Sequence, residues 1–167
     1  MDVFPDRDRN ADGRPENARP RDRFGAPLPR GAVDELAHRQ EPDAVVRSAE
    51  EALRIAVTLF DERRFFEAHE FLEYVWKSDE IPEADREFWK GVTQVAVGCC
   101  HGQRRNDAGA VALLERAEGY LSSYPSPHEG IDTAALRAVA LDVAAQVREH
   151  GASPELEFPA FPIAAKE

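Results

Sequence analysis

Three residues with polar or reactive side chains, His69, Glu73 and Trp76, are regularly spaced within residues 60–77, FDERRFFEAHEFLEYVWK. In an α-helix, residues four positions apart lie one turn apart on the same face, so the imidazole of His69 and the carboxylate of Glu73 can hydrogen-bond. Trp76 lies on the same face at position i+7. Such a pair can bind a ligand or a metal ion, or accept and release a proton.

The same helical face also carries the apolar residues Phe65, Phe66 and Leu72. Amphipathic helices usually keep ionisable residues off the apolar face, because burying an unpaired charge is costly. Two interpretations follow. In the first, His69, Glu73 and Trp76 form a structural polar network that only specifies packing. In the second, they line a pocket that binds a ligand, a metal ion or a proton. The first is favoured because buried polar networks often have no other role.

A second row of small and polar residues lies in a helix predicted over residues 83–105, and it consists of Gly91, Gln94, Gly98 and His101. This row is either the solvated side of that helix or a surface on which the glycines let another helix approach closely. The apolar segment VTQVAVGCC favours a buried helix and hence the second interpretation. The candidate polar pocket is then formed by His69, Glu73, Trp76, Gln94 and His101.

The elements that must position these residues are helices. Apolar residues with helical spacing predict an all-α, compact bundle of about five helices built from antiparallel helical hairpins, with extended N- and C-terminal arms. The helical segments are residues 43–60, 65–77, 83–105, 107–124 and 133–150. A repeat of about 42 residues supports stacked hairpins, because Ala68, Leu72 and Glu73 recur as Ala110, Leu114 and Glu115, each set after an Arg-Arg turn.

The length of 167 residues suits one domain with tails. We expect an Arg- and Pro-rich arm over residues 1–43, extended or disordered, then a helical domain over 44–150 and an extended tail over 151–167. The arm either lies across the acidic domain, reaches a partner or is simply a soluble tail. The arginines concerned are Arg19, Arg21, Arg23 and Arg30.

The net charge of −11 and the isoelectric point of about 4.9 argue against general binding to nucleic acids or anionic membranes, which requires clustered Lys and Arg. No apolar run reaches membrane-spanning length, and the charged N-terminus does not resemble a signal peptide. We therefore expect a cytoplasmic protein. Cys99 and Cys100 are adjacent and cannot readily bridge, which predicts two buried thiols and no disulfide framework.

The segment HEFLEYVW fits an HxxxExxW pattern, and FWKGVTQVAVGCCHGQRRNDAGAVALLERA and EGID follow it. In this combination, residues 49–141 resemble the bacterial and archaeal domain of unknown function family 309, a small all-helical domain. The resemblance implies that His69, Glu73 and Trp76 are signature residues. It also implies recurrent family positions at Gln94, His101, Gly130 and Asp132. The resemblance predicts the fold but no activity, because the family carries no established biochemical function.

We therefore expect a binding or protein-interaction module with a structural His-Glu-Trp network and a protein, peptide or small-ligand partner. Stacked hairpins resemble tetratricopeptide units, which bind peptides in a groove, and the aromatic residues Phe71 and Tyr74 lie away from the His69 face. The alternative is a metal-dependent, hydrolase-like enzyme using His69, Glu73 and His101. The sequence identifies no cofactor, metal ion or oligomeric state.

Overall fold

The computed structural model describes residues 20–165. The chain divides into two units, Met1–Arg39 and Gln40–Glu167. In the first unit, the described residues form turns and one short bridge between Arg21 and Pro27. One carboxylate oxygen of Asp34 accepts hydrogen bonds from the backbone N–H groups of Arg21, at 3.0 Å, and Leu36, at 3.1 Å. Arg19 and the rest of the predicted arm before residue 20 lie outside the described residues.

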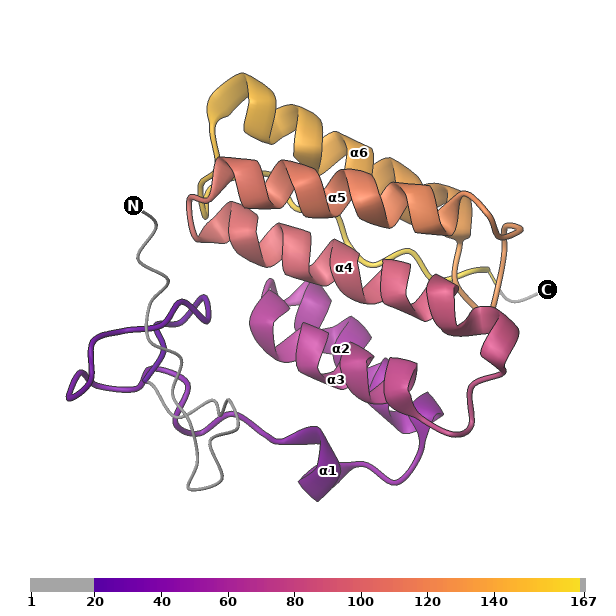
Figure 1. The fold of residues 1–167 in the computed structure, drawn as a ribbon, viewed down its shortest axis with the longest axis horizontal. Helices are drawn as coiled ribbons and strands as arrows, with labels where there is room; N and C mark the ends of the chain where they lie inside the picture. Colours follow the sequence, from indigo (N-terminus) through magenta and orange to yellow (C-terminus); the bar gives the residue numbers. More distant parts are fainter. Residues whose placement is uncertain (1–19, 166–167) are drawn as a thin grey trace, which may run out of the picture. The chain divides into compact units, whose positions relative to one another are not determined.

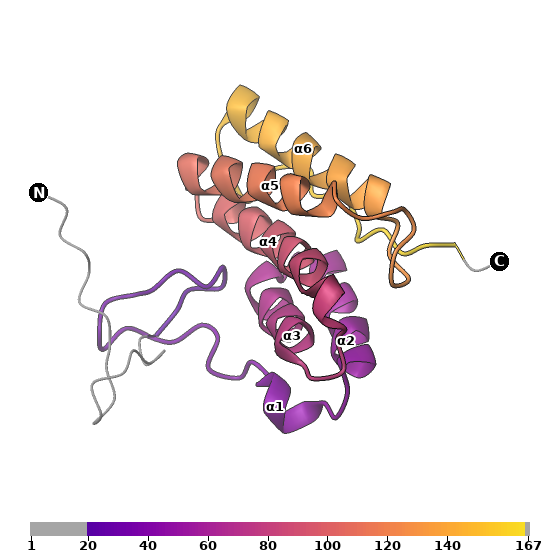
Figure 2. The ribbon, with the colours of Figure 1, turned by 45° about the vertical axis from the view of Figure 1, so that its right-hand side comes forward.

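The second unit is all-helical, as predicted. Figure 1 shows its helices following one another along the chain, with α4 between α3 and α5, and Figure 2 shows the same order from another side. Each helix from α2 to α6 packs against the next. The prediction of about five helices in a bundle is confirmed. The elements are α1 (Pro42–Val45), α2 (Ala49–Asp61), α3 (Phe65–Lys77), the 3-10 helix η1 (Glu83–Asp85), α4 (Arg86–Gln103), α5 (Asp107–Leu121) and α6 (Thr133–His150).

The prediction of one continuous helix over residues 43–60 is wrong, because the chain is extended between α1 and α2. Ser48 has extended backbone angles, and its hydroxyl oxygen accepts a hydrogen bond from the Glu51 N–H at 3.1 Å. A carboxylate oxygen of Glu80 accepts from the Ala49 N–H at 2.8 Å. These two acceptors satisfy N–H groups of the first helical turn, so α2 begins at Ala49 and not earlier.

Three other predicted helix ends are confirmed, whereas α5 ends at Leu121 and not at residue 124. The Asn106 side chain caps α5 by accepting a hydrogen bond from Gly109 N–H, and the Asp132 side chain caps α6 by accepting one from Ala135 N–H. Gly151 ends α6 with a φ of 81°, a conformation that glycine adopts without a steric penalty.

The glycines of α4 let α5 approach closely. A Cβ atom placed on Gly98 would lie 2.6 Å from the Leu114 side chain, and one on Gly91 would lie 3.0 Å from Tyr120 Cβ. Both glycines are buried. The sequence left open whether the row with Gly91 and Gly98 is solvated or packed against another helix. The structure shows that its glycines are packed against α5.

The core is formed by apolar side chains from all five long helices, and by Phe158 and Phe161 of the C-terminal tail, which are 6% and 5% exposed. The tail is extended, and the Phe161 N–H donates to Asp61 Oδ1 at 2.7 Å. Cys99 and Cys100 are buried, as predicted, and burial raises the pKa of the Cys99 thiol. None of the helices in residues 20–165 combines the length and apolar character required to cross a bilayer.

Candidate functional site

His69 lies at the edge of the core, on the exposed side of α3. Its side chain is 18% exposed, and its ring lies 4.9 Å from the Phe66 ring between centroids. Its Nδ1–H donates a hydrogen bond to the Phe66 carbonyl oxygen. The other nitrogen, Nε2, points toward Glu73 and lies 3.9 Å from Oε1. The predicted pair of His69 and Glu73 is therefore present, but its atoms are too far apart for a hydrogen bond.

Glu73 is more exposed than its partner. Its side chain is 40% exposed, and its other carboxylate oxygen lies 3.8 Å from the Lys77 ammonium. Exposed pairs of this kind contribute little to the free energy of unfolding, about 0–1 kcal/mol. The pair lies at the solvent edge of α3 and not within its buried face.

His101 on α4 faces the same region. Its Nδ1 accepts a hydrogen bond from Asn106 Nδ2 at 3.0 Å. Burial lowers the pKa of His101, and the positive charges of Arg104 and His69 lower it further. His69 lies on α3, so its effect on the pKa of His101 means that the two imidazoles are close enough to interact across the two helices. The sequence predicted that these residues face each other.

Gln94 lies two turns before His101 on α4. Its Oε1 atom is buried and has no hydrogen-bond partner among the described residues. A buried carbonyl oxygen without a donor costs about 1–3 kcal/mol relative to a paired one. Gln94 therefore offers an unpaired hydrogen-bond acceptor on the same face of α4 as His101.

Trp76 contacts a lysine that the sequence interpretation did not select. The Lys90 Nζ atom lies 6.0 Å from the centroid of the Trp76 ring and 5.0 Å from that of Tyr120 on α5. A hydrogen bond with Tyr120 raises the pKa of Lys90. Lys90 lies one helical turn before Gln94, so its place on the same face of α4 follows from the sequence. The proximity of Tyr120 depends on how α5 packs against α4.

These half-buried residues of three consecutive helices define what we call the polar face. They are His69, Trp76, Lys90, Gln94, His101 and Tyr120.

The residues predicted for a metal-dependent enzyme, His69, Glu73 and His101, do not lie together as metal ligands would. Within residues 20–165, Asp85, His128 and Glu129 are the one group of three His, Cys, Asp or Glu residues whose potential ligand atoms all lie within 4.8 Å of one another. His69, Glu73 and His101 do not form such a group.

One other expectation is corrected. Phe71 is 1% exposed and belongs to the core, so it cannot form part of a binding surface. Tyr74 is half-buried and lines a cavity of about 560 Å³ together with Glu70 and Glu73. His128, in the loop between α5 and α6, has a side chain that is only 20% exposed and hydrogen-bonds to Asp85.

Residues 53–113 match the model of a family described as Domain of unknown function (DUF309). The predicted resemblance is confirmed for this segment, which contains the polar-face residues of α3 and α4 but not Tyr120. A stretch of 52 residues is 44% identical to the uncharacterized protein YpuF of Bacillus subtilis (strain 168). This stretch covers 31% of the chain and 29% of that protein. The assignment of His69, Glu73 and Trp76 as a family signature stays a prediction.

Proposed function

We propose that this chain, whose residues 53–113 match the DUF309 family model, is a protein-interaction module that binds a peptide segment on the polar face. The observation that carries the proposal is the position of the Lys90 ammonium over the rings of Trp76 and Tyr120. Half-buried aromatic rings supply a large contact area at low entropic cost and are enriched in protein interfaces. The lysine supplies a charge that an acidic partner can pair with.

The charges around the polar face favour an acidic segment. Near Lys90, Glu87 contributes a negative charge and Arg116 a second positive one, and the Arg104 guanidinium lies 5.8 Å from the centroid of the Phe66 ring. These cations belong to a chain whose net charge is −11. A carboxylate-bearing segment would pair with Lys90 and Arg116.

The architecture gives further support. Helices α2 and α3 form one hairpin and α4 and α5 form the next, and successive hairpins stack as they do in helical-repeat proteins. Such proteins commonly bind extended or helical peptides on a surface built from several repeats. The polar face is likewise shared by α3, α4 and α5.

Within this proposal, His69 and Glu73 have a structural role at the edge of the face. The bond from His69 to the Phe66 carbonyl orients the imidazole toward Glu73. Replacing His69 by Ala should lower the free energy of unfolding by about 1 kcal/mol, because one hydrogen bond is lost. Chemical denaturation measures this loss, and Glu149→Ala, at an exposed position on α6, is the control.

The binding proposal can be tested with a library of random dodecapeptides displayed on phage and selected on the wild-type protein. Enriched peptides are then synthesised, and their Kd is measured by fluorescence anisotropy with wild type, Lys90→Glu and Arg54→Glu. Arg54 is an exposed arginine on α2, outside the polar face, and provides the matched charge control.

We expect the enriched peptides to be rich in Asp and Glu. Lys90→Glu should weaken their binding at least about tenfold, since like charges then face each other across the interface. Arg54→Glu should leave the Kd unchanged. A selection without enrichment, or equal effects of the two variants, would contradict the proposal.

A further inference from the structure

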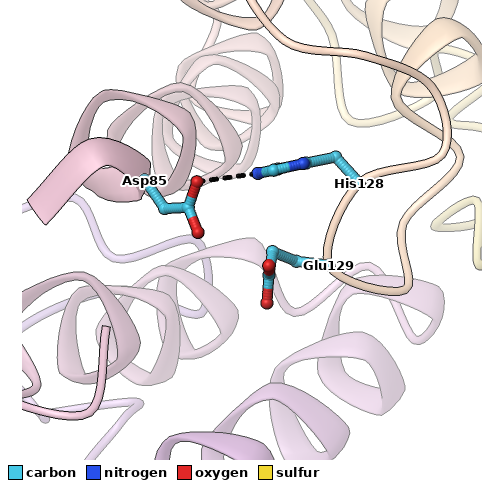
Figure 3. Close-up of side chains that lie close together, drawn as sticks. All are labelled: Asp85, His128 and Glu129. Atoms are coloured by element: carbon cyan, nitrogen blue, oxygen red, sulfur yellow. Dashed lines mark hydrogen bonds and ion pairs between the residues drawn. The ribbon is translucent and has the colours of Figure 1, made fainter. Parts of the chain in front are cut away.

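A histidine and two carboxylates from distant parts of the chain lie close together (Figure 3). Asp85 is the last residue of η1, whereas His128 and Glu129 belong to the loop between α5 and α6. Their potential ligand atoms all lie within 4.8 Å of one another. His128 Nε2 and Asp85 Oδ1 are 2.8 Å apart.

The surrounding structure holds His128 in place. Its ring lies 4.7 Å from the Phe88 ring and 5.3 Å from the Tyr124 ring between centroids. The backbone of His128 exchanges two hydrogen bonds with Ile131, at 3.0 and 2.9 Å. The Tyr124 hydroxyl donates to the carbonyl of Ala84 at 2.8 Å and so ties this loop to the residue before Asp85. The imidazole is therefore oriented by contacts other than its bond to Asp85.

Asp85 occupies the residue before α4, where an aspartate usually accepts a hydrogen bond from the first helical turn. Its carboxylate makes no such bond and points toward His128 instead. The residue is only 8% exposed, and among the described residues His128 is the one hydrogen-bond or ion-pair partner of its side chain. A buried carboxylate turned away from its helix indicates a role in the cluster.

No lysine or arginine side chain in residues 20–165 pairs with either carboxylate. The neighbouring Arg86 donates instead to Glu83 and to the carbonyl oxygens of Trp76 and Ser78. Glu129 is exposed and makes no hydrogen bond or ion pair with the described residues. Two carboxylates therefore lie near one imidazole, and the cluster attracts a cation.

We propose that Asp85, His128 and Glu129 bind a divalent transition-metal ion of the Zn²⁺ class. One imidazole nitrogen and two carboxylate oxygens are ligands that such ions accept, and three protein ligands leave a fourth position for water. Metal–ligand bonds of about 2.0–2.2 Å in a tetrahedral site separate the ligand atoms by about 3.3 Å. Asp85 and His128 must therefore move apart by about half an ångström. The ion replaces the proton that His128 Nε2 donates to Asp85.

The test uses the full chain, freed of metal with EDTA and titrated with Co²⁺ and with Zn²⁺. Visible absorption reports Co²⁺ coordination, and calorimetry gives the Kd and stoichiometry for Zn²⁺. Glu129→Gln removes one ligand at an exposed position, so the fold is retained, which circular dichroism checks. Glu149→Gln is the matched control, because Glu149 also lies beside a histidine, with Oε2 3.8 Å from Nε2 of His150.

We expect one ion per wild-type chain and a loss of Zn²⁺ affinity of at least about tenfold in Glu129→Gln, since removing a ligand should cost no less than removing an outer-shell partner. Glu149→Gln should bind as wild type does. A wild-type protein without stoichiometric Zn²⁺ or Co²⁺ binding would overturn the proposal. Equal affinity of wild type and Glu129→Gln would do the same.

Discussion

Arg63 and Arg105 lie 42 residues apart and have the same left-handed backbone conformation, each with a φ of 62°. The hydrogen bonds around them repeat as well. The Arg63 N–H donates to the Phe60 carbonyl and the Arg105 N–H to the Gly102 carbonyl, which is the same step along the chain. The turns that connect α2 to α3 and α4 to α5 therefore have the same conformation. The sequence repeat of 42 residues reflects this repeated structure.

Replacing Arg105 by Gly should stabilise the protein. A left-handed conformation costs a non-glycine residue about 1–2 kcal/mol, and the greater flexibility of glycine in the unfolded chain offsets about half of this. We expect the free energy of unfolding to rise by about 0.5–1 kcal/mol in chemical denaturation. Arg105 is exposed and has no side-chain partner among the described residues, so no contact is lost. The control is Arg116→Gly inside α5, which should destabilise by about 1 kcal/mol. If both variants lose stability, the strain at Arg105 is negligible.

Replacing Gly98 by Ala should destabilise the α4–α5 contact. The added Cβ would lie 2.6 Å from Leu114, and such overpacking typically costs about 1–3 kcal/mol. Gly119 on α5 offers a matched control, because a Cβ there meets no atom within 4 Å. Gly119→Ala should raise the melting temperature, since alanine is the better helix former by about 1 kcal/mol. Thermal melts of the two variants should therefore shift in opposite directions, and a Gly98→Ala melt equal to that of wild type would contradict the close approach.

His101 should titrate below its ordinary pKa of 6.5, because burial and the charges of Arg104 and His69 disfavour its protonated form. The unfolded chain then binds this proton more readily than the folded one, so His101 lowers stability as the pH falls from about 6.5 toward the folded pKa. NMR titration of the ring protons measures the midpoint. Arg104→Gln should raise this midpoint. A midpoint of 6.5 or above in wild type would show that the imidazole is not desolvated.

The C-terminal tail should contribute to the stability of the helical unit. Phe161 is 5% exposed and its ring lies 5.3 Å from that of Phe60 between centroids. Phe161→Ala should lower the free energy of unfolding by about 3 kcal/mol, as expected for a buried aromatic side chain. Ile163→Ala, two residues further and 50% exposed, should cost much less. Chemical denaturation of both variants checks this, and equal losses would mean that the tail is not docked.

Much of the helical framework was predictable because its signals are local. Asn106 and Asp132 have side chains that cap a following helix, and Gly151 can adopt the conformation that ends one. The i,i+4 spacing of His69 and Glu73 also places them on one helical face regardless of the rest of the fold. The break at Ser48 was missed because the apolar pattern continues through it, and its second cap comes from the distant Glu80.

The sequence by itself determined the all-helical class, most helix ends, the repeated hairpin and the shared face of His69, Glu73 and Trp76, since these depend on residues within one or two turns of each other. The tertiary structure decided which helices lie beside that face. It brought Tyr120 to Lys90 through the glycines of α4, and it brought His128 to Asp85 across 43 positions. Such contacts depend on how helices pack around a common core, which the spacing of residues along the chain does not specify.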